Sequence, residues 1–388
     1  MKKKRKICVI INNRANYARI KSVLNEIKKN KKLKLQIILA SSSILDRFGS
    51  ISDIIKKDGF KVDYKLHTLV DGENLVTMSK STGLSIIEFT NTLTRLKPDI
   101  ALVIADRFET LAAAISASYM NIFLAHTQGG EITGSIDESV RHSTTKLAHL
   151  HFPATQKSKR NIIKMGENPK NVYNFGCPSL DLINLKYLKI DRKFKEKYEN
   201  YGVGELKIDF NKPYIVVLQH PVTTEYGKEK KHILETAKVV TNLNTQVIWL
   251  WPNVDAGSNY LSKTLRIIRE VKKPKNIVWQ KNYNPEDYIK LIYNSSCIVG
   301  NSSSAIREGS YLGIPAVNIG ERQKSRENGS NVINVGYNSK QISLALKKQL
   351  KIKKFKRSNL FGNGNAGKKI VDTLSKINLN ILKRLNYK

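Results

Sequence analysis

Short apolar runs alternate with stretches of helical periodicity along this chain, and this alternation limits the possible folds more than any other feature. The clearest run, residues 99–105 (DIALVIA), is apolar at almost every position, which is typical of a strand covered on both faces. Strands that alternate with helices form parallel sheets joined by crossover helices. The sequence therefore predicts a doubly wound α/β fold.

The alternation occurs in two blocks. In the first we expect strands at residues 7–13, 33–40, 99–105 and 122–126, and helices at 17–29, 45–57, 82–95 and 108–118. In the second we expect strands at 214–220, 246–252, 276–280, 297–300 and 315–319, and helices at 229–241, 260–271, 285–294 and 304–312. A last helix, at 365–385, has no evident place in the second sheet and is expected to cross back to the first.

A chain of 388 residues exceeds the size of most single cores, so two domains are expected. The charged, weakly periodic segment 178–213 separates the two blocks. We predict one Rossmann-like domain at 1–180, joined by the C-terminal helix at 365–388, and a second, nucleotide-binding one at 205–364.

The net charge of +35 admits two interpretations, an anionic partner or a general excess of lysine. The basic runs are rich in lysine and almost free of aromatic residues, so no specific nucleic-acid partner is expected. No apolar stretch is long enough for a membrane span, and no membrane partner is expected. Three cysteines without disulfide or zinc spacing favour a cytoplasmic protein.

Polar residues gather where the predicted strands end, which is where open α/β sheets bind ligands. They come from both blocks: Arg14, Asp106, Arg107, the stretch 126–131, His220, Asn253 and the run 300–308. The sequence therefore predicts a ligand cleft between two facing sheets.

The run 300–315 (GNSSSAIREGSYLGIP) predicts a phosphate site, because backbone N–H groups and serine hydroxyls converge at the start of a helix. Glu308 could accept sugar hydroxyls, and His220 could donate to a phosphate oxygen. Asp106 beside Arg107 could pair a base with a cation that holds a diphosphate. The alternatives are an ordinary N-cap, a solvated glutamate and a strand-end ion pair.

The stretch 126–155 combines carboxylates, glycines and histidines with a helix. Ser135 and Glu138 match a capping box, so the helix is expected to start near Ile136. Asp137 with Arg141 and Glu138 with His142 are then neighbours on its surface. Acid–base chemistry is one interpretation, and a well-capped surface helix is the other.

These motifs resemble the hydrolysing UDP-N-acetylglucosamine 2-epimerases of bacterial sialic-acid synthesis. The similarity covers residues 7–340. It rests on NRANYARI (13–20), DRFETLAAA (106–114), HTQGGEITGSIDESVRHSTTKLAH (126–149), QHPVTT (219–224), WPNVDAGS (251–258) and GNSSSAIREGSYLGIPAVNIGERQ (300–323).

The resemblance implies a GT-B-like fold and a reaction without metal or NAD, usually in a homodimer or homotetramer. A UDP- or GDP-linked 2-acetamido sugar would lose its nucleotide by elimination, and hydration of the glycal would release the 2-epimer. By motif matching, the diphosphate would be held by Arg14, His220, Ser302, Ser303 and Arg322. Asn253, Tyr283 and Glu308 would lie near the nucleoside. Asp106 and Asp137 would be the acid–base carboxylates, with Glu131 close by.

Gln128 departs from the sialic-acid enzymes, which usually have a catalytic glutamate at this position. An amide cannot take a proton at neutral pH. The glutamine form resembles the branch that acts on 2,4-diacetamido-2,4,6-trideoxy sugars on the way to legionaminic acid, a component of surface glycans, and we expect that substrate slightly ahead of UDP-GlcNAc. A GT-B glycosyltransferase and a non-catalytic nucleotide-sugar binding protein are the alternatives.

Overall fold

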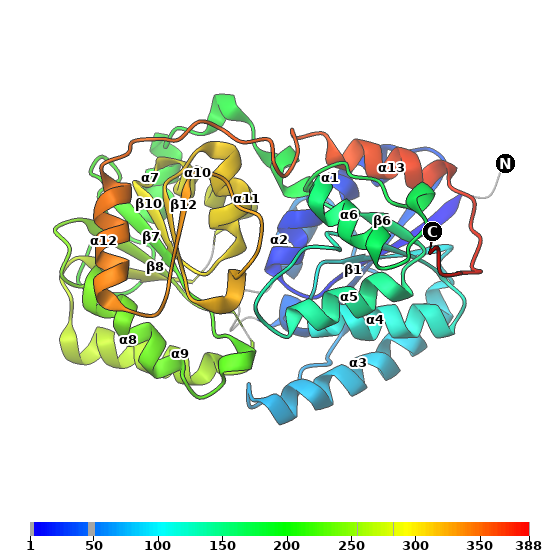
Figure 1. Ribbon diagram of the computed structural model, residues 1–388, viewed down its shortest axis with the longest axis horizontal. Helices are drawn as coiled ribbons and strands as arrows, with labels where there is room; N and C mark the ends of the chain where they lie inside the picture. Colours follow the sequence, from blue (N-terminus) through cyan, green and yellow to red (C-terminus); the bar gives the residue numbers. More distant parts are fainter. Residues whose placement is uncertain (1–3, 46–50, 254, 282, 388) are drawn as a thin grey trace.

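The computed structural model describes residues 4–45, 51–253, 255–281 and 283–387. Its helices and strands form two α/β units that lie side by side in Figure 1. None of the helices in these ranges is long and apolar enough to cross a membrane.

The first unit is a six-stranded parallel sheet in the order β3-β2-β1-β4-β5-β6. Its strands are β1 (Arg5–Ile11), β2 (Leu33–Ala40), β3 (Tyr64–Leu66), β4 (Ile100–Ile104), β5 (Phe123–Thr127) and β6 (Leu150–Phe152). Its helices are α1 (Arg14–Lys29), α2 (Ser52–Lys57), α3 (Leu75–Leu96), α4 (Phe108–Tyr119), α5 (Asp137–Leu147) and α6 (Gln156–Lys164).

The second unit repeats this plan in the order β12-β11-β10-β7-β8-β9, again with parallel pairs. Its strands are β7 (Tyr214–Leu218), β8 (Gln246–Leu250), β9 (Ile277–Gln280), β10 (Cys297–Gly300), β11 (Ala316–Ile319) and β12 (Val332–Val335). Helix α7 (Arg192–Tyr198) precedes it, and its helices are α8 (Glu229–Val240), α9 (Ser258–Ile267), α10 (Pro285–Asn294), α11 (Ser303–Leu312) and α12 (Ser339–Leu350).

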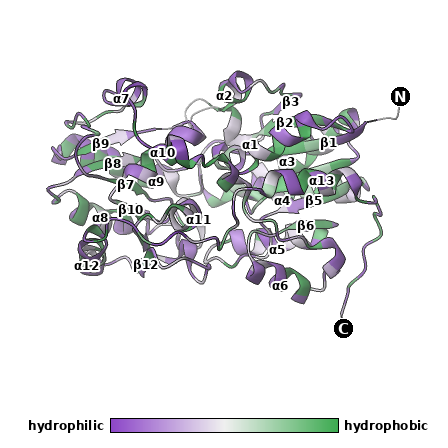
Figure 2. Ribbon diagram, turned by 90° about the horizontal axis from the view of Figure 1, so that it is seen from above, coloured by the Kyte–Doolittle hydropathy of each residue, from purple (hydrophilic) through white to green (hydrophobic). Residues whose placement is uncertain are grey.

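The inner strands are buried on both faces, as the apolar runs predict, whereas the edge strands β3 and β12 are partly exposed. In β1, Ile7 and Val9 pack into the core on one side of the sheet, while Cys8 and Ile10 pack into the core on the other. Figure 2 shows apolar strands between helices with more polar outer faces. The predicted two-domain α/β fold is confirmed, and the domain boundaries at 180 and 205 stay predictions.

The last helix crosses back to the first unit, where α13 (Ala366–Lys376) packs against α1. Ile370, Val371 and Leu374 join the core that contains β1 (Figure 1, red). The predicted end at residue 385 is wrong, because asparagines at 378 and 380 favour local side-chain bonds over helix, and Asn380 Oδ1 accepts from Leu382 N at 3.0 Å.

Other boundaries also differ from the prediction. Helix α3 begins at Leu75 instead of 82, because Asn74 and Thr77 form a capping box there. In place of the helix at 45–57, a 3₁₀ turn (Ser41–Ile44) precedes α2; residues 46–50 lie outside the described ranges. Elements too short or too weakly apolar to predict were β3, β6, β12, α6, α7 and α12.

Candidate active site

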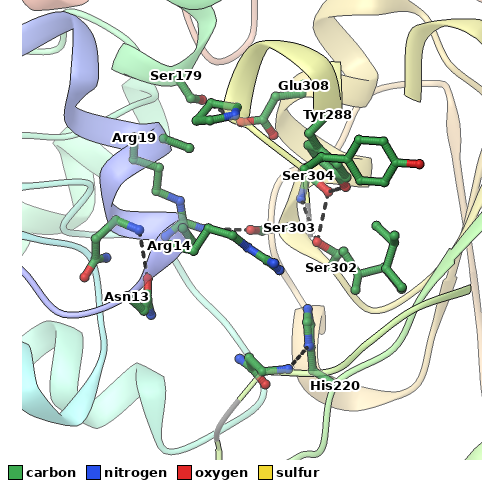
Figure 3. Close-up of a pocket in the computed structure, with 18 of the residues that line it drawn as sticks. Asn13, Arg14, Arg19, Ser179, His220, Tyr288, Ser302, Ser303, Ser304 and Glu308 are labelled. Atoms are coloured by element: carbon green, nitrogen blue, oxygen red, sulfur yellow. Dashed lines mark hydrogen bonds between the residues drawn. The ribbon is translucent and has the colours of Figure 1, made fainter. Parts of the chain in front are cut away.

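A cavity of about 210 Å³ opens between the two units, at the carboxyl ends of their strands (Figure 3). Most residues predicted from the strand ends and the resemblance line it: Arg14, Asp106, Arg107, Asp137, His220, Asn253, Tyr283, Ser302, Ser303, Glu308 and Arg322. Gln128 and Glu131, both in the described ranges, are not among the lining residues.

The N-terminus of α11 forms one wall. Gly300 ends β10 with φ +127°, and a Cβ there would lie 2.1 Å from Leu218 O, so the turn requires glycine. Ser302 is the N-cap and accepts from Ser304 N at 3.3 Å, and its hydroxyl lies 2.9 Å from Ser304 Oγ. Tyr288 OH lies 2.6 Å from Ser304 Oγ. The hydroxyls and the helix N-terminus together suit an anion.

His220 is held as a neutral donor. Its backbone N–H donates to Asn301 Oδ1 at 2.7 Å, and Asn301 Nδ2 donates back to His220 O at 2.8 Å. Its Nδ1 accepts from Asn253 N at 3.1 Å, which leaves the ring proton on Nε2. Burial, and then the charge of Arg322, lower the pKa of His220 to about 3. The imidazole can therefore donate a hydrogen bond without carrying charge.

Two arginines of α1 reach the cavity from the opposite side (Figure 3). Arg14 Nη1 donates to Lys281 O at 3.1 Å, and Arg19 Nη2 donates to Ser303 Oγ at 2.7 Å. Arg19 was not predicted, because it lies inside a helix and not at a strand end. Both guanidinium groups face the α11 N-terminus, so a diphosphate there would lie between cations and N–H groups.

Asp106 follows β4 and is held ionised by Arg141. Arg141 Nε lies 3.2 Å from Asp106 Oδ2, and its Nη2 donates to the same oxygen. Although burial raises the pKa of Asp106, the charges of Arg141, Arg19 and Arg326 hold it well below the usual range. Asp106 is therefore a carboxylate at every pH at which the protein is expected to work.

The pKa of Asp137, at the start of α5, is shifted in the opposite direction to that of Asp106. Burial, and then the negative charge of Asp106, raise its pKa to about 6, although Arg322 lies 3.8 Å away. The predicted partner Arg141 instead donates to Asp106 and Glu138. Two carboxyl groups thus line one cavity with pKa values shifted in opposite directions, an arrangement that suits acid–base chemistry.

Glu131 lies in an ion-pair network across the two units. Arg307 Nη2 is 2.6 Å from Glu131 Oε2, and Arg326 Nη2 is 2.7 Å from the same oxygen. Burial raises the pKa of Glu131, but these two arginines outweigh it and lower the pKa to about 2. These contacts indicate a structural group, and the catalytic role stays a prediction.

Gln128 is fully buried and has a left-handed backbone with φ +62°. Its N–H donates to Phe152 O at 2.9 Å, but neither polar atom of its side chain has a hydrogen-bond partner among the described residues. It follows β5 directly, and β5 pairs with β4, the strand that Asp106 follows. Gln128 cannot carry a proton at neutral pH and is not among the lining residues, and its place in the predicted catalytic set stays a prediction.

The predicted capping box at Ser135 is wrong. Ile136 is the N-cap of α5 and makes no side-chain cap bond. Glu138 accepts instead from Thr133 N, Arg141 Nη1 and His142 Nε2, at 2.7, 2.8 and 2.8 Å. These stronger, partly charged bonds turn the glutamate away from the Ser135 backbone.

Three more predicted lining residues are bonded to neighbouring side chains. Glu308 Oε1 accepts from Ser179 Oγ at 2.6 Å. Asn253 Nδ2 donates to Asp255 Oδ2 at 2.7 Å, and Arg107 pairs with both Asp255 and Glu109. Further lining residues that the predicted set omitted are Arg19, Ser179, Trp251, Tyr288 and Ser304.

Known proteins resemble the chain over almost its full length. The hydrolysing UDP-N,N'-diacetylbacillosamine 2-epimerase of Legionella pneumophila is 31% identical over 98% of this chain and 99% of its own. The GDP/UDP-N,N'-diacetylbacillosamine 2-epimerase of Campylobacter jejuni is 32% identical over 92% of this chain and 90% of its own.

A solved structure shares the fold. The UDP-GlcNAc 2-epimerase of Neisseria meningitidis, bound to UDP-GlcNAc, superimposes with a TM-score of 0.79 at 20% identity, covering 95% of this chain and 99% of its own. The sequence profile of the UDP-N-acetylglucosamine 2-epimerase family matches residues 25–375. The chain therefore belongs to the UDP-N-acetylglucosamine 2-epimerase family.

Proposed function

We propose that the chain is a hydrolysing 2-epimerase of a nucleotide-linked 2-acetamido sugar, with the 2,4-diacetamido-2,4,6-trideoxy sugar ahead of UDP-GlcNAc. The observation that carries the proposal is the pair Asp106 and Asp137, which share one cavity with a diphosphate-binding wall. The two relatives named for the diacetamido sugar are 31% and 32% identical, and a Neisseria meningitidis UDP-N-acetylglucosamine 2-epimerase is 27% identical.

The first step is elimination. The bond between C1 and the diphosphate oxygen breaks, and its electron pair leaves with the nucleoside diphosphate, which Arg14, Arg19 and the α11 N-terminus stabilise. The positive charge that builds at C1 makes the C2 proton acidic, so the weakly basic Asp106 suffices to remove it. The product of this step is a glycal.

The second step is hydration. Water adds its oxygen to C1, and C2 receives a proton on the other face from Asp137, which burial keeps protonated up to about pH 6. The proton that the water loses returns Asp137 to its acid form, and the proton that Asp106 took from C2 is released to solvent. The two steps sum to nucleotide sugar plus water giving nucleoside diphosphate plus the free 2-epimer. Because C2 exchanges its proton, the product carries a solvent hydrogen at that carbon.

The test is turnover in deuterium oxide of UDP- and GDP-linked diacetamido sugar and of UDP-GlcNAc, followed by NMR. We expect a free manno-configured sugar with deuterium at C2. Transfer to an acceptor, or tight UDP binding without turnover, would support the glycosyltransferase or binding-protein alternatives, which the named relatives do not favour. Faster turnover of UDP-GlcNAc would overturn the substrate preference.

We also propose a homodimer or homotetramer in the cytoplasm. The three cysteines, Cys8, Cys177 and Cys297, are buried and unbridged, which suits a reducing compartment. Light scattering after size-exclusion chromatography tests the assembly, and a monomer at micromolar concentration would contradict it.

A further inference from the structure

The chain after α13 returns over the first unit as an extended tail, residues 377–387 (Figure 1, dark red). Most of its side chains face solvent, and those of Leu382 and Tyr387 are 76% and 73% exposed. Lys383 is more buried, with 23% of its side chain exposed, and Ile377 and Leu379 pack against the core that contains β1. The tail therefore combines apolar contacts at its start with a largely buried lysine further along.

Lys383 binds the C-terminus of α5. Its Nζ donates to the carbonyl oxygens of Thr145, Lys146 and Ala148 at 3.2, 2.6 and 2.5 Å. The last carbonyls of a helix lack N–H donors further along it, although Thr145 O also accepts from Ala148 N at 3.2 Å. A cation there also offsets the helix dipole. The lysine therefore acts as a C-terminal cap supplied from a distant part of the chain.

The ammonium group of Lys383 also forms an ion pair with Glu167. Glu167 Oε2 lies 2.8 Å from Lys383 Nζ, and the carboxylate also binds Lys146 at 2.6 Å and His151 at 3.0 Å. Two hydrogen bonds to the backbone of the tail hold it on either side of Lys383, from His149 Nε2 to Ile381 O at 3.1 Å and from Asn386 N to Gly166 O at 2.9 Å. The tail, α5 and the Glu167 loop therefore form one connected network.

The N-terminal half of α5 carries the residues proposed to act in catalysis. Asp137 lines the cavity, and Arg141, one turn further, holds Asp106. An 11-residue helix is about 16 Å long, so it transmits a shift at its C-terminus to these groups as a rigid rod.

We propose that Lys383 is a positioning residue that holds α5 so that Asp137 and Arg141 face the cavity correctly. The proposal rests on the 2-epimerase activity proposed above. Lys383 touches no reacting atom; it acts on the helix that carries them.

The test is Lys383→Met, with the exposed neighbour Arg384→Met as the matched control. We expect kcat to fall about tenfold with KM within about twofold, since a misplacement of 1 Å can cost up to about a hundredfold. Lys383→Arg keeps a cation that can reach carbonyls and should restore most of the activity. Parallel loss of activity and folded protein in Lys383→Met, or an unchanged kcat, would overturn the proposal.

A pH profile separates positioning from simple stability. Asp137 faces the charged groups Asp106, Asp255, Arg141 and Arg322. If α5 shifts, Asp137 loses burial and the influence of Asp106, so the alkaline limb of kcat/KM should move to lower pH in Lys383→Met. An unmoved limb contradicts the positioning role.

Amide hydrogen exchange tests the inference without turnover. Residues 137–147 should exchange faster in Lys383→Met than in Arg384→Met, and equal rates would overturn the proposal. If the wild type turns over no nucleotide sugar, the proposed function fails, and the exchange result alone decides the role of Lys383.

Discussion

Glu131 in the first unit and Arg307 in the second form a buried ion pair, in which Arg307 Nη2 lies 2.7 and 2.6 Å from the two carboxylate oxygens. Arg326, also from the second unit, adds a contact of 2.7 Å. Glu131 and Arg307 do not line the cavity, but their network reaches it, since Arg326 Nη2 also lies 3.8 Å from Asp106 Oδ2. It is therefore positioned to fix the distance between the two walls of the site.

Glu131→Gln should lower the free energy of unfolding by about 3–5 kcal/mol, because it leaves buried arginines without their counter-charge. Urea denaturation at pH 7 measures this, with the exposed Glu196→Gln as the control. A variant that keeps its stability but loses turnover would assign Glu131 to catalysis instead.

The strand-end residues could be predicted from sequence because the position of a parallel strand determines where its last residue points. Arg14, Asp106 and His220 follow this rule. Arg19 does not, since its contact with Ser303 depends on how closely the two units approach. The pairing of Glu131 with Arg307 and the return of Lys383 to α5 depend on the same long-range packing. Local patterns carry no information on these distances.

Asp137 should give kcat/KM an alkaline limb near pH 6. Its proposed role requires the protonated form, and its pKa is raised to about 6, so activity should fall as the pH rises through that value. A bound diphosphate adds negative charge and should move the limb in kcat upward. Rates from pH 4.5 to 9 measure the alkaline limbs of kcat/KM and of kcat. A profile flat across this range would contradict the acid role of Asp137.

The same group should make the protein less stable at alkaline pH. A carboxyl whose pKa is higher in the folded state than its ordinary value of 3.8 contributes stability below that value, which is lost as the pH rises through about 6. Asp137→Asn removes this dependence. It should melt above the wild type at pH 8 and close to it at pH 4, as thermal unfolding by circular dichroism would show.

Arg141→Lys should bring the acid limb of kcat/KM into the measurable range. The guanidinium contacts Asp106 through two nitrogens, and a lysine cannot reproduce that geometry. The pKa of Asp106 should rise, and a base that must be ionised then loses activity at a higher pH. The exposed Arg266→Lys is the control, and equal acid limbs in the two variants would contradict the assignment.

Arg19→Ala should weaken UDP binding about 10- to 100-fold, the range expected for a hydrogen bond to a charged group. Its Nη2 donates to Ser303 Oγ at the start of α11, where the diphosphate is proposed to bind. Isothermal calorimetry with UDP measures the loss, and the 93% exposed Arg192→Ala should leave it unchanged. Undiminished affinity in Arg19→Ala would remove this arginine from the phosphate site.

Gln128→Glu tests the residue that separates the chain from the sialic-acid enzymes it resembles. A carboxyl in this fully buried place is expected to have a raised pKa, so the variant should match the wild type in stability at pH 5 and fall below it at pH 8.

The effect of Gln128→Glu on substrate choice follows from the position of residue 128 after β5, which pairs with β4, the strand that Asp106 follows. If the neutral amide favours the diacetamido sugar, the ratio of kcat/KM for UDP-GlcNAc to that for the diacetamido substrate should rise about tenfold in Gln128→Glu, which corresponds to about 1.4 kcal/mol. Gln128→Ala separates charge from size, since it removes the amide without adding a carboxyl. A folded Gln128→Glu with an unchanged ratio would place the discrimination elsewhere in the cavity.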